Sequence, residues 1–337
     1  MATIKDVARE AGVSVATVSR VMNNSSHASA ATKSVVQQAM LKLGYRPNAN
    51  ARALVSQTTN TIGVLIGDVS DPFYGSMVKA IDSIAIQNGK HLLIGNGYHN
   101  ADFEREVIEL LINSRCESLV IHSKALSNQE LIRFAEEKPT MVLINRYIPE
   151  IAERCIALDN FRGSYLATEH LIKMGHTQIG YVCSNHEIED TEQRKNGYLS
   201  ALQAYNIKVN PAYIEYGAPT ELGGEEAMTH LLSKDLQLTA IATYNDYMAA
   251  GALSILDENG IQVPRDISLI GFDDGIIAKY LSPKLTTMRY PIQMMAEKAV
   301  HLAFLLATGQ PITDPIRIFV PTMIRRASVI AHSCSTR

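Results

Sequence analysis

The chain has 337 residues, of which 46% are hydrophobic and 19% charged, and this excludes a disordered, collagenous or membrane-embedded chain. Its length predicts two or three globular domains. No apolar run reaches the roughly 18 residues of a membrane span, and the N-terminus lacks a secretory signal, so we expect a cytoplasmic protein without a membrane partner. Four cysteines lie far apart and form no C-x-x-C pair, which argues against disulfides and a zinc site.

Charge is distributed unevenly along the chain. Residues 1–60 carry seven Lys or Arg against two Asp or Glu, a formal charge of +5. Residues 61–337 carry 24 basic against 32 acidic residues, a charge of −8. A basic head on an acidic body is typical of a nucleic-acid-binding module attached to a domain with a different task.

The basic head has the pattern of a helix-turn-helix. Thr3 stands three residues before an aspartate and predicts a near-capping-box start for a first helix. Gly12 permits a positive φ in the turn, and Ser14 is a good N-cap for a second helix that runs to about Asn23. A third amphipathic segment, about 31–43, covers the core between the first two helices.

The outward face of the second helix offers side chains that suit DNA. Arg20 can bond a guanine bidentately in the major groove, although an exposed Arg is also typical of a solvated surface. Val15 and Ala16 can touch base edges, and hydroxyl groups suit phosphate oxygens. The candidate DNA contacts of the head are Thr3, Ser14, Val15, Ala16, Thr17, Ser19, Arg20 and Asn23.

IKDVAREAGVSVATVSRVMN, followed by YRPNANARAL, resembles the lactose/galactose repressor (LacI/GalR) family, most of all its galactose-responsive members. The resemblance implies a lambda-repressor-like helix-turn-helix domain at 1–47 and a hinge helix and linker at 48–60. It also implies that Asn48, Ala51 and Leu54 contact operator DNA, with Leu54 inserted as a wedge in the minor groove. Such a wedge costs a few kcal/mol, offset by the contacts that bent DNA allows. Without the family, a leucine at position 54 would more often be an ordinary linker residue.

Residues 61–337 alternate short apolar runs with amphipathic stretches of roughly 10–15 residues, which predicts parallel sheets covered by helices. About 270 residues exceed a comfortable single sheet, so we expect an α/β body of two doubly wound lobes. The expected strands are 62–66, 91–94, 118–121, 141–144, 156–158, 179–182, 240–243, 267–270 and 286–288.

The resemblance implies a periplasmic-binding-protein-like body that binds sugar and dimerises. Its N-lobe would comprise about 61–160 and 291–320, and its C-lobe about 161–290 and 321–330. The chain would cross between the lobes near Asn160, Pro291 and Pro321.

Ligands of open α/β sheets bind beyond the carboxyl ends of the strands, and planar polar side chains with aromatic rings suit a sugar there. Because the chain has no Trp, a sugar would stack on Phe73 or a tyrosine. The family match implies ligand contacts at Asp71, Phe73, Asn145, Arg146, Arg194, Asn245, Asp273 and Tyr290. His122, at a strand end, is an additional candidate that is equally typical of an ordinary surface group.

In two pairs of adjacent residues, either member could contact the ligand. Asn245 and Asp246 precede a helix, where either is a plain N-cap, and we assign Asn245 to the ligand and Asp246 to the cap. Of Asp273 and Asp274 we favour the first as a ligand contact.

The sequence lacks a P-loop, a complete dinucleotide fingerprint, H-E-x-x-H, G-x-S-x-G and metal-spaced His or Cys clusters. We therefore expect no enzyme, no metal and no cofactor. Acid–base chemistry by the Asp273–Asp274 pair and a transport receptor are alternatives, and the basic head opposes both.

The predicted function is a repressor that binds pseudo-palindromic operator DNA as a homodimer. The resemblance favours galactose as an inducer that lowers operator affinity, and the coupling is reciprocal. Another sugar or a purine acting as a corepressor, with the opposite sign, stays open at this stage. The last 15 residues contain no leucine heptads, so a tetramerising coiled coil is not expected.

Overall fold

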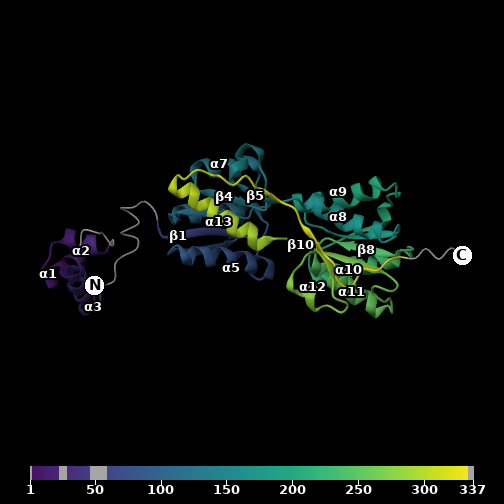
Figure 1. Cartoon of the computed structure of the whole chain (residues 1–337), viewed down its shortest axis with the longest axis horizontal. Helices are drawn as coiled ribbons and strands as arrows, with labels where there is room; N and C mark the ends of the chain where they lie inside the picture. Colours follow the sequence, from purple (N-terminus) through teal and green to yellow (C-terminus); the bar gives the residue numbers. More distant parts are fainter. Residues whose placement is uncertain (1, 23–28, 46–58, 333–337) are drawn as a thin grey trace. The chain divides into compact units, whose positions relative to one another are not determined.

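The computed structural model describes residues 2–22, 29–45 and 59–332 (Figure 1). Residue contacts divide the chain after Thr59 into a small N-terminal unit and a large unit. The predicted DNA contacts Asn23, Asn48, Ala51 and Leu54 lie outside the described residues, as does nearly all of the predicted segment 48–60.

The N-terminal unit contains the predicted helix-turn-helix. The capping box is present, because Thr3 Oγ1 accepts from the Asp6 N–H and the Asp6 carboxylate accepts from the Thr3 N–H at 2.9 Å. Gly12 has φ +65°, and Ser14 Oγ accepts from the Thr17 N–H at 3.1 Å. The helices are α1 (Ile4–Glu10), α2 (Val15–Met22) and α3 (Ala30–Lys42). Their shared core consists of Val7, Ala8, Ala11, Val18, Val21, Val36 and Ala39.

The N-lobe of the large unit is built on a six-stranded sheet in which every neighbouring pair is parallel. Its order is β11-β5-β4-β3-β1-β2. The strands are β1 (Thr61–Ile66), β2 (His91–Asn96), β3 (Ser118–Ile121), β4 (Met141–Ile144), β5 (Cys155–Leu158) and β11 (Ile318–Phe319). The helices are α5 (Pro72–Gln87), α6 (Ala101–Asn113), α7 (Asn128–Glu137), η1 (Pro149–Arg154) and α13 (Ile292–Thr308).

The C-lobe repeats this plan with the order β12-β10-β9-β8-β6-β7, in which only β12 runs antiparallel to its neighbour. The strands are β6 (Ile179–Ser184), β7 (Ile214–Gly217), β8 (Ala240–Thr243), β9 (Ser268–Asp273), β10 (Thr286–Arg289) and β12 (Thr322–Ile324). The helices are α8 (Asn160–Lys173), α9 (Glu189–Ala204), η2 (Pro211–Tyr213), α10 (Glu221–Ser233), α11 (Asp246–Glu258) and α12 (Ile276–Tyr280).

Both faces of each sheet are covered by helices, because alternate residues of a strand point to opposite faces. In the N-lobe, Val64 packs with α5 and α13, whereas Leu65 packs with α6 and α7. In the C-lobe, Tyr181 packs with α8 and α9, whereas Val182 packs with α10, α11 and α12. Parallel strands buried on both sides read as continuous apolar runs, and this is why the sequence revealed them.

All nine predicted strands are present, which confirms the doubly wound α/β prediction. The sequence missed β7, β11 and β12, which lie at sheet edges or have only two or three residues. The chain passes between the sheets after β5, after β10 and between β11 and β12. No described helix has the length and apolar character of a membrane span.

Candidate functional site

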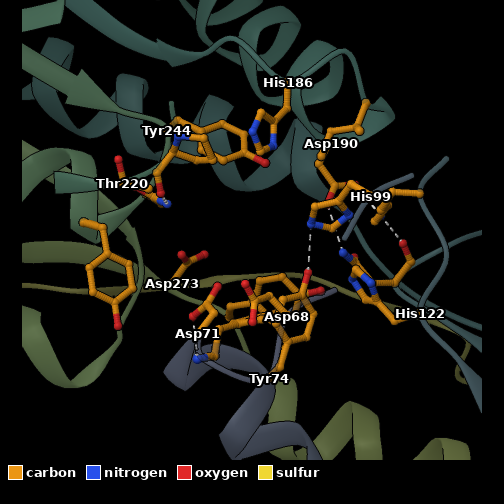
Figure 2. A pocket seen from close by; sticks show the side chains of 18 of the residues that line it. Asp68, Asp71, Tyr74, His99, His122, His186, Asp190, Thr220, Tyr244 and Asp273 are labelled. Atoms are coloured by element: carbon orange, nitrogen blue, oxygen red, sulfur yellow. Dashed lines mark hydrogen bonds and ion pairs between the residues drawn. The ribbon is translucent and has the colours of Figure 1, made fainter. Parts of the chain in front are cut away.

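A cavity of about 620 Å³ lies beyond the carboxyl ends of the strands of both sheets, where the predicted ligand residues come together (Figure 2). Asp71 and Asp273 point into the same space, and three histidines gather at one side of it. The predicted residues in the wall are Asp71, Phe73, His122, Asn145, Arg194, Asn245, Asp273 and Tyr290. Arg146 is the one predicted ligand residue that does not line this cavity.

Arg194 of α9 is held rigidly at the base of the site. Its Nε donates to Asn160 Oδ1 at 2.8 Å, and Nη1 donates to the Tyr244 carbonyl at 2.6 Å. The guanidinium lies between two rings, 4.5 Å from the Tyr244 centroid and 3.8 Å from that of Phe272. Only 3% of the residue is exposed. An Arg fixed in this way presents a planar donor in one orientation, as recognition of a sugar hydroxyl requires.

Asp273 ends β9 beside this guanidinium, with Oδ1 3.6 Å from Arg194 Nη1. Its φ of +114° is unusual for a residue with a side chain, and strained backbone of this kind is common at binding sites. Burial raises the pKa of Asp273 to about 7, against the opposing effect of Arg194, and the charges of Asp71 and Asp190 add to the rise. Its neighbour Asp274 faces away and pairs with Arg289 and Arg326.

A buried ion pair joins the two lobes at the cavity wall. Lys124, in the loop after β3, donates from Nζ to Asp190 Oδ1 of α9 at 2.7 Å, and Asn145 Nδ2 donates to Asp190 Oδ2 at 2.9 Å. The side chains of Lys124 and Asp190 are 1% and 9% exposed. Burial alone would raise the pKa of Asp190, but the charges of Lys124 and Arg194 outweigh it and lower the pKa.

The sequence missed this pair. Two local features of the sequence could have pointed to it. Lys124 lies three residues after the apolar run of β3, and Asp190 belongs to the acidic first turn of α9.

Arg146 clamps the loop that carries Lys124 instead of facing the ligand space. Its guanidinium donates to the Leu126 carbonyl at 3.1 Å and to Asn128 Oδ1 at 2.8 Å. From the other side, the buried carboxylate of Glu104 accepts from the backbone N–H groups of Lys124, Ala125 and Leu126. The structure therefore gives Arg146 a positioning role, because its donors are committed to loop carbonyls.

An aromatic wall completes the cavity. Tyr74 Oη lies 3.3 Å from His99 Nε2, and the His99 ring lies about 6 Å from the rings of His122 and of His186. Burial lowers the pKa values of all three histidines, so they are neutral at pH 7. Phe73 packs edge-to-face on Tyr290, with ring centroids 4.9 Å apart.

Several neutral polar atoms in the wall have no partner within the described part of the chain. They are His99 Nδ1, His122 Nδ1, Asn145 Oδ1 and Tyr290 Oη. Buried polar atoms are nearly always hydrogen-bonded, so an unpartnered group of them facing one cavity indicates a ligand or water site.

The assignment of Asn245 and Asp246 needs a correction. Asn245 is the N-cap of α11, because its Oδ1 accepts from the Met248 N–H at 2.8 Å, although it also lines the cavity. Asp246 does not cap that helix. It accepts from Thr287 Oγ1 at 2.6 Å and from the Gly275 N–H at 2.8 Å. The helix starts one residue earlier than the assignment required, so the first residue of the pair became the cap.

In the N-terminal unit, Val15, Ala16 and Arg20 are exposed on α2, as a reading helix requires. Ser14 and Thr17 share a hydrogen bond of 2.9 Å between their hydroxyls, and Thr3 is engaged in its capping box. Among the described residues, no group of three or more His, Cys, Asp or Glu side chains is arranged to hold a metal ion.

Two family descriptions match the chain. "Bacterial regulatory proteins, lacI family" matches residues 3–48, and "Periplasmic binding protein-like domain" matches residues 168–329. The chain is 55% identical to the HTH-type transcriptional regulator GalR of Escherichia coli (strain K12), over 99% of this chain and 97% of that protein. It is 53% identical to the HTH-type transcriptional regulator GalS of Salmonella typhimurium, over 98% and 97% of the two chains.

Solved structures agree with these matches. The Lac repressor dimer bound to operator and the anti-inducer ONPF is similar with a TM-score of 0.86, at 27% identity over 98% of this chain and 99% of that one. A complex of the transcriptional regulator CelR with cellobiose is similar with a TM-score of 0.70, at 26% identity over 97% of this chain and 100% of that one.

Proposed function

Because this chain belongs to the lacI family of bacterial regulatory proteins, we propose that it binds galactose in the cavity between its lobes and then releases operator DNA. The chain is a DNA-binding transcriptional regulator rather than an enzyme. We place its activity in the cytoplasm, where operator DNA is available.

The observation that carries the proposal is the chemistry of the cavity wall. Arg194 and Asp273 form a preorganised donor and acceptor, and the same wall contains His122, Asn145 and Tyr290, each with an unpartnered neutral polar atom. Each sugar hydroxyl both donates and accepts, so it needs groups of both kinds. The ring of Phe73 supports stacking of the apolar face of the sugar.

For DNA binding we propose that Arg20 reads a base pair while Val15 and Ala16 touch base edges, because all three are exposed on one short helix. Two chains would present two heads to a pseudo-palindromic operator. In this proposal residues 1–47 form the DNA-binding domain, 48–60 the hinge with its Leu54 wedge, and 61–337 the sugar-binding and dimerisation domain.

The coupling follows from the two lobes. A sugar that contacts both lobes favours one arrangement of them, and any movement of the N-lobe moves the start of β1, which continues from the hinge. If the sugar weakens operator binding by some factor, the operator weakens sugar binding by the same factor.

The test is a mobility-shift titration of the full chain with a palindromic operator, with and without galactose. We expect galactose to weaken binding, and binding that tightens with galactose would reverse the sign to that of a corepressor. Arg20→Ala should cost about 1–3 kcal/mol of operator binding and relax selection at one base pair. Unchanged selection across base variants would remove Arg20 from base reading, and failure to shift any duplex at low salt would overturn the whole function.

A further inference from the structure

The cavity lies where phosphate groups usually bind in this type of fold, because helix N-termini surround it. Helices α5, α9, α10 and α11 all begin at the carboxyl edges of the sheets. A helix N-terminus offers free N–H groups and a positive dipole end, which together attract phosphate. Four of them around one cavity would ordinarily favour an anionic ligand.

Three of these helix ends are capped by the chain's own polar side chains, and the fourth, that of α9, has no side-chain cap but an acidic first turn. Asp71 caps α5 by accepting from the Phe73 N–H at 2.8 Å, and Asn245 caps α11. Thr220 caps α10, whose first residue is Glu221. The first turn of α9 carries three acidic residues, among them Asp190. One N–H group in each of α5, α10 and α11 is thus already bonded within the fold, and the acidic side chains of α9 and Glu221 of α10 oppose the attraction of a phosphate to these helix ends.

Both positive side chains of the wall already lie beside a carboxylate, Lys124 beside Asp190 and Arg194 beside Asp273. Among the described residues that line the cavity, Lys124 and Arg194 are the two Lys or Arg side chains. Lys124 is engaged by Asp190 and the Asn145 carbonyl, and Arg194 by Asn160 and the Tyr244 carbonyl. Five acidic residues share the wall with them, namely Asp68, Asp71, Asp190, Glu221 and Asp273.

The side chains of the wall that contain an atom without a hydrogen-bond partner are uncharged. His122, Asn145 and Tyr290 line the cavity, are each at least nine-tenths buried, and each contain an unpartnered polar atom in an uncharged group. Burial lowers the pKa values of the three histidines, which disfavours their charged forms in the cavity without ligand. A buried phosphate would lose its hydration in a wall that holds five acidic against two basic residues, and like charges nearby increase this cost.

We propose that the cavity accepts neutral sugars and rejects their phosphorylated forms, with Glu221 and Asp71 as the acidic residues that enforce this selectivity. This inference rests on the proposed function and specifies the chemical class of its ligand. Glu221 is exposed where it lines the cavity, so an approaching anion meets it early.

The test is calorimetry of the full chain with matched pairs: galactose and galactose 1-phosphate, glucose and glucose 6-phosphate, and inorganic phosphate alone. For each sugar that binds, we expect its phosphorylated form to bind at least about 100-fold more weakly than the sugar itself. Inorganic phosphate should neither bind nor compete. A phosphorylated sugar within about threefold of its parent would overturn the inference and leave the sugar-sensing function standing. Binding by none of the neutral sugars would overturn both.

A pair of variants tests whether Glu221 causes the selectivity against phosphorylated sugars. Glu221→Gln removes a charge from the cavity edge, whereas Glu226→Gln removes one from the exposed side of the same helix, outside the cavity wall. We expect Glu221→Gln to narrow the ratio of galactose to galactose 1-phosphate affinity by about threefold or more, because an exposed charge acts weakly but measurably. Glu226→Gln should leave the ratio unchanged. Equal ratios in both variants would remove Glu221 from the selectivity.

Discussion

The two lobes share one scaffold but differ in whether their polar groups at the cavity already have hydrogen-bond partners. Read from one edge, their sheet orders are β2-β1-β3-β4-β5-β11 and β7-β6-β8-β9-β10-β12, so each strand has a counterpart. In the C-lobe, Arg194 is bonded and stacked inside its own lobe before any ligand arrives. In the N-lobe, His99, His122 and Asn145 each keep an unpartnered polar atom at the cavity.

This difference shows that the fold determines where a ligand binds, while the residues after each strand determine what is bound and how. The C-lobe is preorganised and should dominate affinity, since fixed groups lose little entropy on binding. The N-lobe supplies groups whose hydrogen bonds are completed by the ligand. Variants in the two lobes should therefore differ in the size and the kind of their effects.

The largest effect is expected from Arg194→Met. The change removes the buried guanidinium from Asp273, Asn160 and the Tyr244 carbonyl, so we expect a loss of about 3–5 kcal/mol in the free energy of unfolding. Galactose should no longer release the operator. Chemical denaturation and the mobility-shift assay measure these outcomes. Lys195→Met, which breaks a surface pair with Glu192 on the same helix, should cost less than about 1 kcal/mol.

The second prediction concerns the link between the lobes. Lys124→Met leaves the Asp190 carboxylate buried without its cation, and we expect a loss of about 3 kcal/mol in the free energy of unfolding. The double variant Lys124→Met/Asp190→Leu should recover most of this loss, because removing both charges leaves no unpaired one. A double variant as unstable as the single one would show that the ion pair itself stabilises the body.

Much of this architecture could be predicted from the sequence because its signals are local. The apolar runs identified nine strands, and residues directly after them, such as Asp273 and Asn145, line the cavity. The head followed from a capping box, a turn glycine and an apolar periodicity, all within about 20 residues.

The remaining features depend on distant contacts. Lys124 and Asp190 are 66 positions apart and meet only because the lobes do. Arg146 looked like a ligand residue because it follows a strand, yet the carbonyls of the neighbouring loop engage it. The misassigned helix cap at Asn245 and Asp246 reflects a single-residue difference in where a helix begins, which sequence patterns do not determine.

The third prediction tests the ring contribution of the N-lobe. Phe73→Ala removes the ring that packs on Tyr290 at the cavity, and we expect galactose affinity to fall about tenfold to thirtyfold through lost apolar contact. Operator binding without sugar should stay as in the parent. Phe161→Ala, at an exposed position of α8 outside the cavity wall, is the matched control. An equal loss of affinity in both variants would argue against stacking at Phe73.

The smallest effect is a pH dependence of sugar binding through Asp273. Sugar hydroxyls donate to its ionised carboxylate, so binding favours the charged form. Because burial raises the pKa of Asp273 to about 7, the group is mostly protonated at pH 6 and mostly charged at pH 8. Galactose affinity should therefore rise with pH, by up to about tenfold over that range, as calorimetry at several pH values would measure.

The raised pKa of Asp273 has the opposite effect on the stability of the unliganded protein, which should fall as the pH rises. A carboxyl whose folded pKa is raised contributes stability at acidic pH that is lost as the pH rises from about 4 through about 7. Protection by galactose against unfolding should thus grow with pH while intrinsic stability declines. Asp273→Asn should flatten this decline of stability with pH, because it removes the titrating carboxyl. An affinity that falls as the pH rises would place the titrating group elsewhere and leave the preorganised pair of the C-lobe without its acceptor role.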